Sequence, residues 1–331
     1  MPDRRRAQGT RKTRRTTARS AGGHSAVSGR TRWLLLAGLA LAALAIVAVI
    51  ALRNPAPGAP VAWTRFGTQD VHSLAFVDSD PSRVLFGHHG GLLASSDGGR
   101  NWSALSVRDD AMSTVPASDG SVVIAGHEVF MASRDGGATW APIESDLPSI
   151  DIHGFTRDPG DPARMWAYLA TGGLWESTDF GSQWTRVRED NVLFPVAVRA
   201  AAGVRVLGVD TTGLVASDDG GRTWAELGSP EAFPVTAVAA TPDGQTLYVG
   251  SLDGLLRSDD GGRTWVRTAY VGSVLAVATT PDGATVAVVS RDTEFYRSAD
   301  RGATWPAPRG VTLGLGGLVR GRLASAQRAW P

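Results

Sequence analysis

The chain has 331 residues and a formal net charge of +1, and it contains no cysteine. The lack of cysteine excludes disulfide bonds and thiolate chemistry. The near-neutral total conceals a division, because residues 1–32 hold ten of the 33 basic residues and only one of the 32 acidic residues. A basic N-terminal tail therefore precedes an acidic remainder.

Residues 33–52 read WLLLAGLALAALAIVAVIAL and carry no charge. Twenty apolar residues span a bilayer as a helix, and the Arg-rich flank at 1–32 marks the cytoplasmic side. We therefore predict a single-pass protein of the cell membrane with residues 62–331 outside the cytoplasm. A cleaved signal peptide is the alternative, although its apolar core is usually shorter.

Two short segments flank the predicted helix. Residues 53–61 are rich in Pro and Ala and predict a stiff spacer. The basic tail at 1–32 is interpreted as a topology signal that also contacts anionic lipid. We therefore predict no nucleic-acid partner.

An eight-residue box is repeated through the rest of the chain. SDDGGRTW occurs at 217–224 and at 258–265, and four looser copies fit the pattern S-x-D-x-G-x-(T/N/Q)-W. The closing tryptophans are 38 to 44 residues apart, and they are Trp102, Trp140, Trp184, Trp224, Trp265 and Trp305. Such a period indicates one supersecondary unit that must pack against its neighbours.

Each repeat predicts four short strands. Between residues 235 and 265, VTAVAATP ends in a Pro-Asp-Gly turn, TLYVGS ends at Asp253-Gly254, LLRS leads into the box, and WVRTA follows it. Four antiparallel strands per 40-odd residues are typical of a propeller blade. We therefore predict an all-β propeller over residues 62–331.

The box itself is interpreted as a structural turn between the third and fourth strands. Its Ser and Asp can bond to backbone, its central Gly suits a positive φ, and its Trp is a large anchor. A feature present in every blade is scaffold rather than site, so structural roles are assigned to Asp97, Asp135, Asp179, Asp219, Asp260 and Asp300.

The box resembles the BNR or Asp-box repeat. That repeat is found in sialidases, other propeller glycoside hydrolases, sortilin-type receptors and photosystem assembly factors. The resemblance covers roughly residues 62–310 and implies a propeller, but the fold hosts enzymes and non-enzymes alike. VHSLAF, GHHGGL and DIHGFTRDPGDP also resemble bacterial propellers labelled glycosyl hydrolase.

Function is expected where the repeats differ. The first strand begins and the second strand ends on one rim, opposite the boxes, and this rim surrounds the mouth of the central channel. Polar residues gather there in blades one to three. We predict a ligand site from His72, His89, His127, His153 and Met112, with Asp70, Asp110 and Asp151 beside them.

Three interpretations of these residues stay open. They could be ordinary polar loop residues, with aspartates capping turns and histidines bonded to carbonyls. They could bind a divalent metal, for which His72 and His153 are the candidate ligands; no other cofactor is implied. Two of Asp70, Asp110 and Asp151 could instead act as the paired carboxylates of a hydrolase, if they lie about 5–10 Å apart.

A sialidase-specific site is not supported by the sequence. The Arg-Ile-Pro segment expected before the first box is missing, and no arginine triad that could grip a carboxylate is evident. Tyr270 would lie on the proper rim for a nucleophile, but Glu189 and Glu231 are only guesses for its partner.

The two ends of the propeller region predict how the ring closes. AWTRFG at 62–67 resembles a fourth strand, and residues 311–331 could supply a first and a second strand. We expect these to form a composite seventh blade, with six blades as the alternative. The predicted function is a monomeric binding or assembly module for a glycan or protein ligand; the alternative is an exo-acting glycoside hydrolase.

Overall fold

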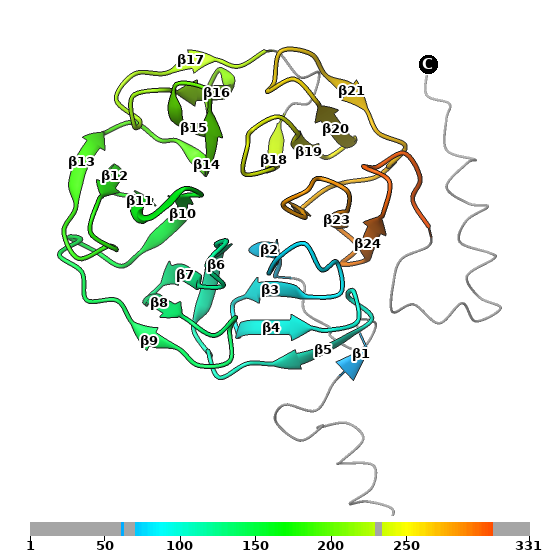
Figure 1. The fold of residues 1–331 in the computed structure, drawn as a ribbon, viewed down its shortest axis with the longest axis horizontal. Coiled ribbons are helices and arrows are strands. Elements are labelled where there is room, and N and C mark those ends of the chain that lie inside the picture. The colour runs from blue at the N-terminus through cyan, green and yellow to red at the C-terminus, as the bar shows by residue number, and fades with distance from the viewer. Residues whose placement is uncertain (1–60, 63–69, 229–233, 307–331) are drawn as a thin grey trace, which may run out of the picture. The chain divides into compact units, whose positions relative to one another are not determined.

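The computed structural model describes residues 61–62, 70–228 and 234–306. These residues form six β-sheets arranged around a central axis, as Figure 1 shows. No helix within these ranges is long and apolar enough to cross a membrane. The predicted membrane helix at 33–52 and the predicted strands at 311–331 lie outside the described residues.

Five blades have four consecutive strands, and the described part of the sixth has three. The first half of the ring consists of β2 (Ser73–Phe76), β3 (Val84–His88), β4 (Gly91–Ser95), β5 (Asn101–Ala104), β6 (Asp110–Pro116), β7 (Val122–His127), β8 (Val129–Ser133), β9 (Ala141–Pro142), β10 (Ile152–Asp158), β11 (Asp161–Leu169), β12 (Gly173–Ser177) and β13 (Thr185–Arg188). The second half consists of β14 (Leu193–Ala200), β15 (Gly203–Asp210), β16 (Gly213–Ser217), β17 (Ala225–Glu226), β18 (Val235–Ala240), β19 (Leu247–Ser251), β20 (Gly254–Ser258), β21 (Val266–Arg267), β22 (Ala276–Thr279), β23 (Val286–Val289) and β24 (Phe295–Ser298).

The burial of each strand follows its position in the blade. The inner strand β18 alternates between buried and half-buried residues, as expected for a strand with one face toward a channel. The next strand, β19, is buried at all five positions because neighbouring blades cover both of its faces. The outermost strand β21 has two exposed residues.

The hydrophobic core is divided among the seams between blades. Each of the six seams holds a cluster of buried side chains drawn from two neighbouring sheets. At the seam between the last and the first blade, Phe86 and Trp102 pack with Phe295. The ring therefore closes directly, by apolar contact between segments about 200 residues apart.

This closure shows that the expectation of seven blades was wrong. The sixth blade packs on the first, which leaves no seam for a composite seventh blade. The short strand β1 (Val61–Ala62) pairs instead with β5, where Val61 lies opposite Trp102. A terminal strand thus covers the outer edge of the first blade, which satisfies backbone groups that would otherwise be free.

The box turns share a common pattern of hydrogen bonds, which the second blade shows in full. In the second blade, Ser133 donates to Asp135 Oδ1 and accepts from the Gly137 amide, while Asp135 accepts from the Thr139 amide and hydroxyl. The indole of Trp140 donates to the Gly137 carbonyl at 3.0 Å. These bonds hold the carboxylate as an anion, so they lower the pKa of Asp135 to about 2.

Candidate functional site

Four histidines and two aspartates meet on the rim opposite the boxes. Each lies at the start of a first, inner strand or at the end of a second strand: His72 precedes β2, His89 follows β3, Asp110 begins β6, His127 ends β7, and Asp151 and His153 lie at the start of β10. We call these six residues the rim cluster. They come from three consecutive blades, because inner strands begin and second strands end on the same rim.

Two glycines allow the start of β6 to pack closely against its neighbours, Gly87 from the first blade and Gly126 from the adjacent strand β7 of the same blade. A Cβ on Gly126 would lie 1.8 Å from the carbonyl oxygen of Asp110, and one on Gly87 would lie 2.3 Å from that of Ala111. Neither position could hold a larger residue without moving the start of β6. The absence of two side chains thus fixes the position of Asp110.

Asp110 is the centre of the cluster. Its Oδ2 lies 2.6 Å from Nδ1 of His89 and 2.9 Å from Nδ1 of His127. Its Oδ1 lies 3.3 Å from Nε2 of His72 but is not in hydrogen-bonding geometry with it, so this buried oxygen has no hydrogen-bond partner among the described residues. One carboxylate therefore joins histidines from the first and second blades.

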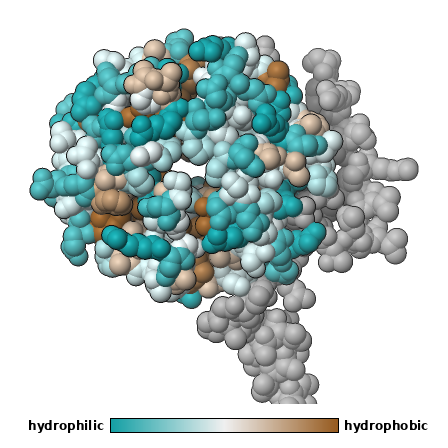
Figure 2. Space-filling model, in the orientation of Figure 1, coloured by the Kyte–Doolittle hydropathy of each residue, from teal (hydrophilic) through white to brown (hydrophobic). Residues whose placement is uncertain are grey.

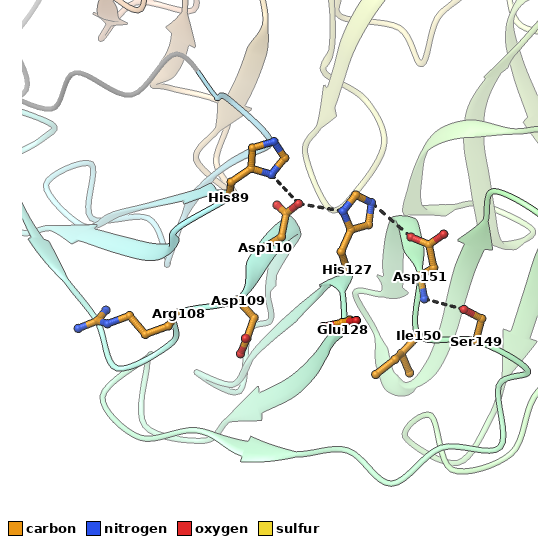
Figure 3. A pocket seen from close by; sticks show the side chains of 9 residues that line it. All are labelled: His89, Arg108, Asp109, Asp110, His127, Glu128, Ser149, Ile150 and Asp151. Atoms are coloured by element: carbon orange, nitrogen blue, oxygen red, sulfur yellow. Dashed lines mark hydrogen bonds and ion pairs between the residues drawn. The ribbon is translucent and has the colours of Figure 1, made fainter.

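The third blade continues the chain of contacts. Nε2 of His127 lies 3.3 Å from Oδ1 of Asp151 and 3.2 Å from Nε2 of His153. Nε2 of His153 also lies 3.2 Å from Oδ1 of Asp151. Figure 3 shows His89, Asp110, His127 and Asp151 as a continuous row of alternating imidazoles and carboxylates.

The cluster passes from a buried centre to exposed edges. Asp110 is nine-tenths buried, whereas the side chain of His89 is 55% exposed. Burial lowers the pKa of His72, because desolvation disfavours the imidazolium. The hydrogen bond to Asp110 raises the pKa of His89. Two histidines on one carboxylate thus have pKa values shifted in opposite directions.

The cluster lies between two cavities. A rim cavity of about 720 Å³ is lined by His89, Asp110, His127 and Asp151. The central channel, of about 1040 Å³, is lined by the inner strands and includes His72 and His153. An opening near the centre of the ring is visible in Figure 2. A bound ligand could therefore contact the cluster from the rim or from the channel.

Two further residues predicted for the site, Asp70 and Met112, and the neighbouring His88 have different positions. Asp70 is exposed just before the first blade and contributes its negative charge to the environment of His72 and His89. Met112 is half-buried and lines the channel. His88, the remaining histidine of the propeller, stacks on Phe86 and accepts a bond from the Gly90 amide. None of the three belongs to the rim cluster.

Two of the residues considered for a sialidase-like site, Tyr270 and Glu189, have other roles in the described part of the chain. Tyr270 is buried, its hydroxyl donates to the Ser273 carbonyl at 3.1 Å, and its ring packs on Tyr296 and Trp305. Burial raises the pKa of Tyr270, which opposes a nucleophilic role. Glu189 is exposed and paired with Arg186, and Glu231 lies outside the described residues.

The structure adds lining residues that sequence reasoning missed. Arg108, Glu128, Ser149 and Ile150 also line the rim cavity. Glu128 has a φ of 58°, which is rare for a residue other than glycine, and its amide donates to the Ile150 carbonyl. The only available signal was that each of these residues is a near sequence neighbour of a cluster residue.

The geometry distinguishes the two chemical interpretations of these residues, a hydrolase site and a metal-binding site. Asp110 and Asp151 contact opposite nitrogens of His127, so this imidazole occupies the space between the carboxylates. In glycoside hydrolases that space holds the scissile bond. The arrangement instead presents several imidazole nitrogens and carboxylate oxygens at close range, which suits binding of a cation or a polar group.

Comparison with known proteins identifies the fold. Residues 129–243, about a third of the chain, match the DUF6242 beta propeller domain family. No curated protein matches the sequence. The propeller fold that the BNR resemblance implied is thus supported, whereas membership of the BNR family itself stays a prediction.

Similar solved structures are remote in sequence. The crystal structure of the GH74 enzyme from Niastella koreensis is 16% identical with a TM-score of 0.50; the match covers 75% of this chain and 48% of that one. YCF48 from Cyanidioschyzon merolae is 17% identical with a TM-score of 0.48, and the match covers 76% and 88% of the two chains. The chain spans about half the length of the GH74 structure, and the likeness to that structure shows a shared β-propeller fold alone.

Proposed function

We propose that the protein is a membrane-anchored, extracytoplasmic binding module whose ligand contacts the rim cluster. The observation that carries this proposal is the convergence of four histidines and two aspartates from three blades. Ordinary polar loop residues have no reason to meet across two seams. Perturbed titratable groups beside a cavity are also typical of functional sites.

The anchoring part of the proposal is supported by the sequence. The uncharged segment at 33–52 is long enough to span a bilayer, and the basic residues at 1–32 favour a cytoplasmic tail. The propeller would then bind a glycan or protein ligand close to the extracytoplasmic surface of the membrane. A binding module is favoured over a hydrolase because His127 lies between the two carboxylates.

A binding screen tests this function. The full chain, purified in a mild detergent, is applied to an array of immobilised polysaccharides and to a peptide library. We expect a ligand whose binding is lost in His72→Ala and in His153→Ala. The matched control is Asp218→Asn, which alters an ion pair with Arg205 at a variable position within a box, on the opposite rim. This substitution should leave binding unchanged.

Two results would contradict the proposal. One is a ligand whose binding tolerates both histidine substitutions but is lost in the control. The other is turnover of aryl glycosides that Asp110→Asn or Asp151→Asn abolishes, which would assign the carboxylates to a hydrolase.

A further inference from the structure

Three residues of the rim cluster, His127, Asp151 and His153, have the geometry of a metal site. We propose that His127, Asp151 and His153 bind a divalent first-row transition ion, with Zn²⁺ as the first candidate, and that Asp110 orients His127. This inference rests on the proposed function and deepens it, because it names the chemical class of one ligand of the same rim.

The distances among the three side chains match a coordination polyhedron. His127 Nε2, His153 Nε2 and Asp151 Oδ1 form a nearly equilateral triangle with sides of 3.2, 3.2 and 3.3 Å. Bonds of about 2.0–2.1 Å to a tetrahedral zinc ion would place its ligand atoms about 3.3–3.4 Å apart. Charge-assisted hydrogen bonds are shorter, at about 2.7–2.9 Å. The two sides that meet at His153 are within hydrogen-bonding range, but the nearly equal lengths of all three sides fit a single shared ion.

The available protons also favour a cation. Nδ1 of His127 lies 2.9 Å from the Asp110 carboxylate, which can only accept, so the proton of a neutral His127 belongs on Nδ1. Nε2 then carries a lone pair, and it faces Oδ1 of Asp151 at 3.3 Å. Two lone pairs at this distance repel each other unless a positive charge lies between them. A metal ion supplies that charge, and a second proton on His127 is the alternative.

Asp110 provides the supporting contact that metal-binding histidines usually have. Such histidines donate their other ring N–H to a carboxylate or a carbonyl, which fixes the tautomer and the ring orientation. Asp110 is nine-tenths buried, and its Oδ1 has no hydrogen-bond partner among the described residues. A buried carboxylate with one unpartnered oxygen increases the negative potential at the site, which favours a bound cation.

Three protein ligands leave a coordination position open. His127 and Asp151 line the rim cavity, and His153 lines the channel, so the ion would lie where the two spaces meet. An open position on a zinc ion is filled by water or by an oxygen or nitrogen of a ligand. The ion would thus be available to a carboxylate or another donor group of a bound molecule.

Metal binding can be measured directly on the full chain. The protein is purified in mild detergent through a tag without histidine, treated with a chelator, and titrated with Zn²⁺ against a chromophoric competitor. We expect His127→Ala and His153→Ala to lower the affinity by more than about 100-fold, and Asp110→Asn to lower it by about 10- to 100-fold. His88→Ala is the matched control and should leave the affinity unchanged.

Cobalt substitution separates the ligands from the positioning residue. Co²⁺ bound to the metal-binding triad of His127, Asp151 and His153 should give visible d–d absorption bands. These bands should disappear in His127→Ala and in Asp151→Asn. Asp110→Asn should weaken Co²⁺ binding but keep these bands, because it does not remove a ligand. The proposal is overturned if the chain binds no Zn²⁺, as expected for a doubly protonated His127, or if binding is unaffected by the triad substitutions.

The same protein samples distinguish this inference from the proposed function. If the chain binds no Zn²⁺ at the triad, but a screened ligand still binds and is lost in His72→Ala, the metal inference fails and the binding function stands. If Zn²⁺ binds at the triad but the screen finds no ligand that depends on the rim, the metal site stands and the binding function fails.

Discussion

Replacing Trp102 with alanine should destabilise the propeller more than the same change at the equivalent Trp of another box. Trp102 is 1% exposed and lies at the seam that closes the ring, between Phe86 and Phe295 with ring centroids 6.0 and 5.8 Å away. Its indole also donates to the Gly99 carbonyl at 3.0 Å. Its loss removes contacts on both sides of the seam.

The expected magnitude follows from this burial. Replacing a buried aromatic residue with alanine costs about 3–5 kcal/mol, and we expect Trp102→Ala to cost about 4 kcal/mol. Such a loss would lower Tm by about 8–16 °C, given about 2–4 °C per kcal/mol for a domain of this size. Trp140 is only half-buried, so Trp140→Ala should lower the free energy of unfolding by about half as much.

Urea unfolding of the full chain in mild detergent, followed by far-UV circular dichroism, measures both variants without relying on tryptophan fluorescence. Trp102→Phe should recover part of the loss, because a smaller ring still fills much of the space. If Trp102→Ala costs no more than Trp140→Ala, the seam between the last and first blades is not what closes the ring.

Four further predictions test other parts of the molecule. The hydrogen bonds of the box hold the pKa of Asp135 at about 2, below its unfolded value of 3.8. The stability that this carboxylate contributes is therefore present above about pH 4 and is lost as pH falls through about 2. The midpoint of urea unfolding should fall over that pH range, and a constant midpoint would contradict the prediction. Asp110→Asn should abolish the raised pKa of His89, measured by NMR of the ring protons; an unchanged value would show that Asp110 is not its cause. The buried guanidinium of Arg157 donates to the Val115 and Ser121 carbonyls, so Arg157→Ala should cost about 3 kcal/mol in urea unfolding, and a cost below about 1 kcal/mol would refute this role. Deleting residues 1–60 should yield a soluble all-β monomer by chromatography and circular dichroism, and protease added outside intact cells should cleave the full-length propeller; protection of the propeller in that assay would refute the topology.

The repeat period and the box pattern were sufficient to predict the blades. These signals are local, because each turn is stabilised by a Ser, an Asp and a Trp within eight residues, as in the box that ends at Trp140. The rim was also predictable, since an antiparallel blade brings the start of its first strand and the end of its second strand to one side. The four histidines and Asp110 and Asp151 therefore lie on the rim expected from the sequence.

The number of blades and the contacts within the cluster were decided only by the tertiary structure. Closure depends on whether Phe295 packs against Trp102, a contact between distant segments that no local pattern encodes. Likewise, the sequence suggested His72 and His153 as possible metal ligands, whereas the structure places them in different groups, with His89 and Asp110 and with His127 and Asp151. Which side chains meet depends on how closely the start of β6 packs at Gly87, across a seam, and at Gly126, within its own blade, because a Cβ at either glycine would collide with the backbone of β6. Distances of this kind arise from packing across seams, and a single sequence does not contain them.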